Sequence, residues 1–135
     1  MFEKVDYTAL NSRQRENYNF QKVAGVLADH YGYNCPRLSD DWQGADFIGC
    51  HINGDIFLKV QLKGRLTLDQ KYQGKEVHVA FFANDACFIY PHDAFLQAAL
   101  DQGKINDSVS WKDHGSYTWP SIPGWAKPFL ENYKV

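Results

Sequence analysis

The stretch that decides the fold is Gly44–Lys63, with the sequence GADFIGCHINGDIFLKVQLK. It contains two runs rich in apolar and β-branched residues, 47–52 and 56–62, on either side of Asn53-Gly54. Such runs favour β-strands, and Asn-Gly is typical of a two-residue hairpin turn because both residues readily adopt a positive φ. The stretch therefore predicts two antiparallel strands joined by a tight turn.

The same hairpin decides which polar side chains meet. In a tight turn at Asn53-Gly54, paired residues have numbers that sum to 107, so Asp46 is expected near Gln61. Successive side chains of a strand point to opposite faces, so Lys63 shares a face with Gln61. The pattern predicts that these three polar side chains gather at one end of the hairpin.

A helix is expected before the hairpin. Apolar side chains recur at three- and four-residue spacings from Ser12 to Tyr31. Asn11 with Gln14 resembles a capping pair, and Gly32 is placed for a left-handed C-terminal cap. On a helical wheel Glu16 projects with the apolar stripe, so we expect its carboxylate on the core-facing side of the helix.

The other segments complete a single α/β domain over residues 1–135. Residues 33–38 favour a strand, and residues 39–44 a polar loop. Further expected elements are two strands in a hairpin at 77–82 and 87–90, a short helix at 91–100, and an aromatic C-terminal extension at 104–135 that packs on the core and contains Trp111, Trp119 and Trp125.

Composition sets limits on partners and location. The chain is 44% hydrophobic with a formal net charge of −2, so binding to a nucleic acid requires a local basic patch. The three cysteines are widely spaced and read as reduced core thiols, and neither they nor the five histidines show metal-ligand spacing. There is no signal-peptide pattern and no apolar run near the roughly 20 residues that span a bilayer. These features predict a cytoplasmic protein without a membrane partner.

Gly44-Ala45-Asp46-Phe47-Ile48, followed across the hairpin by Phe57-Leu58-Lys59-Val60-Gln61-Leu62-Lys63, resembles the PD-(D/E)xK nuclease superfamily. The pattern of that superfamily is an acidic residue at a strand start, a hairpin, and an acid-x-Lys element on the next strand. With the helix, the resemblance runs from about Ser12 to Phe82. It implies a restriction-endonuclease-like fold, in which helices flank a mixed central sheet and an N-terminal helix precedes a strand hairpin. Two positions depart from the pattern: Ala45 replaces the usual Pro, and Gln61 replaces the acid.

The resemblance implies a divalent-metal-dependent endonuclease that hydrolyses DNA phosphodiester bonds with Mg²⁺ or Mn²⁺. Asp46, Gln61 and the backbone carbonyl of Leu62 are then the metal ligands, and Lys63 assists the attacking water. The amide of Gln61 can bind a hard cation but supplies no charge. A further acid is therefore expected, and Glu16 occupies the first-helix position from which the superfamily often supplies one. DNA is the implied partner, and a homodimer would let so small a chain grip two strands.

Other charged residues lie near the expected site. Arg65, Lys71 and Lys75 follow it at positions where a nucleic-acid backbone would need cations, although a solvated turn accounts for them as well. Asp40 and Asp41 either compete for a metal role or belong to the polar loop.

Simpler interpretations stay open at this stage. An Asp after a glycine, as at Asp46, is typical of a turn acceptor, and Gln61 and Lys63 also suit the solvent face of an amphipathic strand. The alternative function is a catalytically inactive nuclease-like fold that binds nucleic acid or a protein partner. A third hypothesis is an aromatic ligand groove at the tail, which requires its three tryptophans to line an open cleft.

Overall fold

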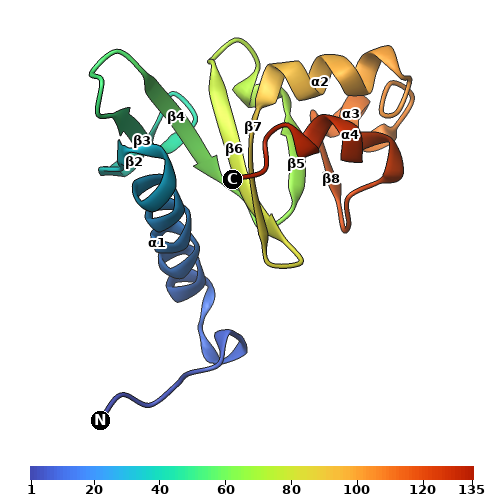
Figure 1. Ribbon diagram of the computed structural model, residues 1–135. Helices are drawn as coiled ribbons and strands as arrows, with labels where there is room; N and C mark the ends of the chain where they lie inside the picture. The colour runs from blue at the N-terminus through green and yellow to red at the C-terminus, as the bar shows by residue number, and fades with distance from the viewer.

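The computed structural model describes residues 1–135 and shows an α/β fold built on one mixed, curled sheet (Figure 1). The strands run in the order β1-β3-β4-β6-β7, and β2 also pairs with β3. Their bounds are β1 (Tyr33–Asn34), β2 (Arg37–Trp42), β3 (Ala45–His51), β4 (Phe57–Leu62), β6 (Val77–Ala83) and β7 (Ala86–Pro91). The β4–β6 pair is parallel and all other pairs in this sheet are antiparallel. The α/β class with an N-terminal helix before the strands is confirmed.

The β3–β4 hairpin has the register predicted from its sequence, since all four residue pairs have numbers that sum to 107. Its turn is wider than expected, with residues 52–56 between the two strands. The N–H of His51 nevertheless donates to the carbonyl of Ile56 at 3.0 Å, and this closing pair keeps the same sum. Asn53 Oδ1 accepts from two backbone N–H groups of the loop, so its side chain stabilises the wider turn.

Helix α1 (Ser12–Tyr31) covers one face of the sheet. Its N-terminus carries the expected capping box between Asn11 and Gln14, and Gly32 ends it with a φ of 73°. The apolar stripe of the helix packs on inward-facing strand residues. The buried members of this first core cluster are Val23, Leu27, Phe47, Val60, Ala80, Cys87 and Ile89.

The C-terminal half of the chain covers the opposite face, as the right side of Figure 1 shows. It comprises a two-stranded antiparallel sheet of β5 (Leu66–Asp69) and β8 (Ser116–Trp119), together with α2 (His92–Asp101), α3 (Val109–His114) and α4 (Lys127–Glu131). Three short 3₁₀ helices, η1 (Tyr7–Ala9), η2 (Gln70–Tyr72) and η3 (Gly124–Ala126), complete the elements. Phe95 lies in this second cluster, with its ring 5.5 Å from that of Trp125 and 5.8 Å from that of Trp119.

Two expectations are wrong. Residues 39–42 belong to β2 rather than to a loop; β2 pairs on one side only and its side chains are mostly exposed, so no apolar alternation marks it. The three tail tryptophans do not together line an open cleft, because Trp111 is buried, Trp125 stacks on Phe95, and only the edge of the largely buried Trp119 reaches a surface groove. Burial of these rings supplies packing energy for the second cluster.

Candidate functional site

Asp46 is the second residue of β3 and its half-buried side chain turns to the end of β4. Its Oδ2 accepts a hydrogen bond from the backbone N–H of Leu62 at 2.9 Å. The paired residues of this ladder end at Phe47 and Val60, and Asp46 and Gln61 are the next residues beyond that last pair. The structure thus brings the acid of β3 beside the Gln61–Leu62 segment of β4.

A glycine fixes how the chain enters β3. Gly44 has a φ of 83°, in the region that favours glycine. A Cβ at this position would lie 2.9 Å from Cδ1 of Tyr72 and 3.2 Å from Cγ2 of Val77. Ala45, the next residue, is completely buried. This close contact holds the start of β3, and with it Asp46, against the Tyr72 ring.

Gln61 is buried although its side chain is polar, with 9% of its surface exposed. Its Nε2 donates to the carbonyl of Leu62 over a long 3.4 Å, and its Oε1 has no hydrogen-bond partner. A buried oxygen without a partner costs about 1–3 kcal/mol. Gln61 therefore does not lie on a solvent-exposed strand face, and its carbonyl oxygen is free to accept a donor or a cation.

Lys63 and Tyr72 also lie at the end of β4, near Asp46. The N–H of Lys63 continues the ladder by donating to the carbonyl of Ala80 at 3.0 Å. Its ammonium lies 5.6 Å from the centre of the Tyr72 ring, and the ammonium of Lys71 lies 5.2 Å from it. Tyr72 is 1% exposed, yet its hydroxyl has no hydrogen-bond partner. Little in the sequence marks Tyr72 as a site residue, apart from its being the sole aromatic residue of the run 67–75.

The surroundings of Asp46 contain groups that raise the pKa of its carboxyl and groups that lower it. Burial raises the pKa of its carboxyl above the ordinary value, and the negative charges of Asp41 and Glu16 add to this. The hydrogen bond from Leu62 and the charge of Lys63 lower the same pKa, without cancelling the rise. The pKa of Tyr72 is also raised, by burial and then by the charges of nearby acids that include Asp41 and Asp46. Burial is therefore the main reason that the ionised form of Asp46 is disfavoured, and the nearby acids add to it.

Glu16 is not packed toward the core as the helical wheel predicts. It is exposed and lines a surface hollow of about 650 Å³ together with residues of the first turn of α1 and of β2. The first turn of α1 lies beyond the buried part of the helix, whose fully buried residues begin at Val23. Glu16 still lies near enough for its charge to act on Asp46.

The three cations expected after the site have different surroundings. Arg65 is exposed and lines a surface groove, Lys71 is exposed beside Tyr72, and Lys75 is half-buried. Lys71 lies 4.0 Å from Asp69, a separation at which an exposed ion pair contributes little.

The donor set at Asp46 consists of oxygens. No group of three or more His, Cys, Asp or Glu side chains is placed to hold a metal ion. The Asp46 carboxylate, the unpartnered Oε1 of Gln61 and the carbonyl of Leu62 are nevertheless hard ligands of the kind that Mg²⁺ and Mn²⁺ prefer. A cation at this position would also stabilise the ionised form of the Asp46 carboxylate, which burial disfavours.

Comparisons with known proteins identify no relative: the chain matches no protein-family model, no curated protein and no solved structure. None of its helices combines the length and the apolar character needed to cross a membrane.

Proposed function

We propose that the chain is a divalent-metal-dependent endonuclease of PD-(D/E)xK type that hydrolyses DNA phosphodiester bonds. The observation that carries the proposal is the position of a half-buried acid whose pKa is raised, Asp46, against the end of β4, where Gln61 has a buried, unpartnered carbonyl oxygen. Polar groups held at such cost are typical of functional sites. The restriction-endonuclease-like fold belongs to the same proposal, supported by the mixed sheet and by the order of helix and hairpin.

Asp46, Gln61 and the carbonyl of Leu62 would hold Mg²⁺ or Mn²⁺, which when bound polarises the phosphate and lowers the pKa of water. The Leu62 N–H orients the Asp46 carboxylate. Lys63, whose ammonium lies beside Tyr72, offsets negative charge that develops on the phosphate. Glu16 supplies additional negative charge from α1 and would support the ion or the water.

A cleavage assay tests this proposal. Purified protein is incubated with supercoiled, linear and branched DNA in Mg²⁺ or Mn²⁺, with EDTA as the metal-free control. Lys63→Ala should lower the cleavage rate at least about tenfold, because it removes a cation next to the reacting phosphate. Lys59→Ala is the matched control, since Lys59 lies two residues before Gln61 on the same strand. Absence of metal-dependent, Lys63-dependent cleavage on all three DNA forms would contradict the proposal.

The alternative is a catalytically inactive nuclease-like fold that binds nucleic acid or a protein partner. The neutral side chain of Gln61 favours it, because an amide contributes no charge to a metal site. Gln61→Glu separates the two functions. If the native site is catalytic, the variant should cleave at a lower metal concentration than the wild type. DNA binding without cleavage by either protein would support the inactive fold.

A further inference from the structure

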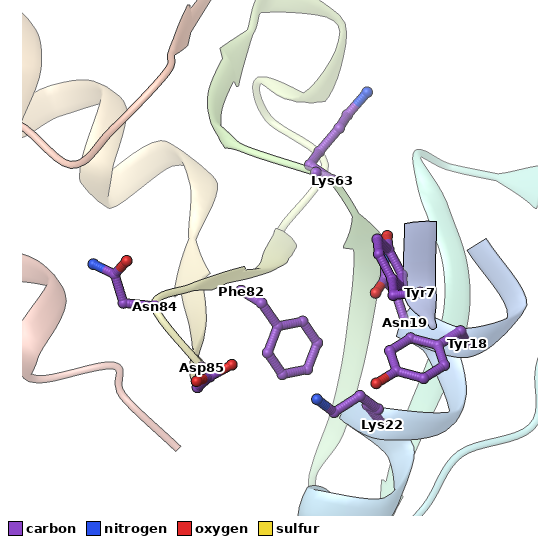
Figure 2. Close-up of a pocket in the computed structure, with 9 residues that line it drawn as sticks. Tyr7, Tyr18, Asn19, Lys22, Lys63, Phe82, Asn84 and Asp85 are labelled. Atoms are coloured by element: carbon purple, nitrogen blue, oxygen red, sulfur yellow. The ribbon is translucent and has the colours of Figure 1, made fainter. Parts of the chain in front are cut away.

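A surface groove of about 400 Å³ lies between α1 and the β6–β7 hairpin. One wall is formed by Tyr18 and Lys22 of α1 with Tyr7 of η1, and the other by Phe82 and the hairpin turn. Figure 2 shows the rings of Tyr18 and Phe82 close to the side chain of Lys22. A second groove of about 490 Å³ shares Gly64, Phe82 and Asn84 with the first, so the two adjoin each other at the end of β4 and together are called the groove.

Two aromatic rings of this groove, Tyr7 and Tyr18, lie outside the buried cores, whereas Phe82 packs against the first core cluster with part of its ring exposed. Tyr7 and Tyr18 are 38% and 42% exposed, and their ring centres lie 5.1 Å apart. The ammonium of Lys22 lies 5.3 Å from the Tyr18 ring and 5.0 Å from the Phe82 ring. Neither tyrosine belongs to a core cluster, and the contacts of Tyr7 with Tyr18, Asn19 and Arg15 leave part of both rings exposed. Exposed rings next to a cation are suited to stacking on nucleobases.

The charge of the groove favours a polyanion. The linings of its two parts contain Lys22, Lys63, Arg65 and Lys127, against the single acid Asp85. This excess of cations stands out in a chain whose net charge is −2. Cations that follow a groove lined by aromatic rings are the usual arrangement for a single strand, because the bases of a duplex are stacked on one another and cannot reach the rings.

Lys63 joins the groove to the candidate site. Its side chain lines the groove, whereas its ammonium lies over the Tyr72 ring next to Asp46. In Figure 2 the Lys63 side chain points away from Phe82 and Lys22, consistent with that contact. Asp46 and Gln61 line neither part of the groove, so Lys63 is the residue that links the groove to the position where phosphate hydrolysis is proposed.

We propose that this groove binds an unpaired nucleic-acid strand, with bases stacked on Tyr18 and Phe82 and phosphates near Lys22, Arg65 and Lys127. The inference rests on the proposed function and narrows its substrate to DNA with a single-stranded segment beside the cleavage point.

Fluorescence anisotropy in EDTA and low salt tests binding apart from cleavage. The probes are labelled dT20, a 20-base-pair duplex, and a 20-unit abasic strand with the same phosphates. We expect dT20 to bind most tightly of the three probes. Tyr18→Leu should weaken the binding of dT20 about fivefold or more, because a stacking contact is lost. Lys22→Gln should lower the slope of log affinity against log salt concentration by about 0.7, because one contact to a phosphate is lost. Tyr31→Leu and Lys104→Gln are controls; Tyr31 is similarly exposed but lies about 20 Å further along α1.

The outcomes separate the groove from the catalytic site. Binding of duplex or abasic strand as tightly as dT20, or equal affinity of groove variants and controls, would overturn the groove proposal even if the protein cleaves DNA. Selective, Tyr18-dependent binding of dT20 by a protein that cleaves no DNA would support the groove and reject the nuclease. Urea denaturation of each variant verifies that it is folded.

Discussion

Replacement of Gly44 by alanine tests whether the entry to β3 is held against Tyr72. At a φ of 83°, a residue with a Cβ costs about 1–2 kcal/mol. The new Cβ would also lie 2.9 Å from a Tyr72 ring atom, and overpacking of this kind costs typically about 1–3 kcal/mol. The expected loss in the free energy of unfolding is therefore about 2–5 kcal/mol.

Gly54→Ala is the matched control, because Gly54 has a φ of 79° and a Cβ added there would meet no atom within 4 Å. Urea denaturation followed by tryptophan fluorescence gives both free energies of unfolding. Gly44→Ala should cost about 1–3 kcal/mol more than Gly54→Ala, the part due to the Tyr72 contact. In a Tyr72→Leu background this excess should shrink, since the ring is gone. Equal losses at the two glycines would refute the reasoning.

Three further predictions use the same denaturation assay. Burial and nearby acids raise the pKa of Asp46 in the folded protein. The free energy of unfolding is therefore higher when Asp46 is protonated, and it falls as the pH rises through the folded-state pKa. Asp46→Asn should therefore be more stable than the wild type at pH 7, with a gap that narrows toward pH 4; a gap that widens on acidification would contradict this. Tyr90→Phe should destabilise by about 1–3 kcal/mol, because the Tyr90 hydroxyl both donates to the carbonyl of Thr67 and accepts from its N–H. Tyr72→Phe should not destabilise, because the Tyr72 hydroxyl has no partner; a loss as large as that of Tyr90→Phe would show that it has one.

Local chemistry made the hairpin and the first helix predictable. Asn53 fixes the loop through its own backbone contacts, and the register follows from those contacts even though the loop is wider than a two-residue turn. The capping box of Asn11 and Gln14 likewise depends on residues three apart. The pairing of Asp46 with the Gln61 region was predictable because one local turn sets it.

Contacts between distant segments could not be predicted in the same way. Strand β5 pairs with β8, about fifty residues later, and the sequence of neither segment indicates which strand it pairs with. Tyr72 reaches Gly44 only because the crossover from β4 to β6 carries it back over the sheet. Glu16 was placed from helical periodicity alone, which does not reveal where the sheet beneath a helix ends.

The positions of buried polar groups that lack hydrogen-bond partners bear on the function of the protein. The interior has two apolar clusters, and buried polar groups such as Tyr90 and His92 have hydrogen-bond partners. Four buried side-chain atoms lack a partner: Arg15 Nε and His78 Nδ1, and the oxygens of Gln61 and Tyr72, which both lie near Asp46. Packing alone would be served better by apolar side chains at both positions, because an unpartnered buried polar group lowers stability. A ligand that supplies donors or positive charge at Asp46 would account for all three side chains together, whereas a structural role accounts for Asp46, which accepts from the Leu62 N–H, but not for the unpartnered oxygens of Gln61 and Tyr72.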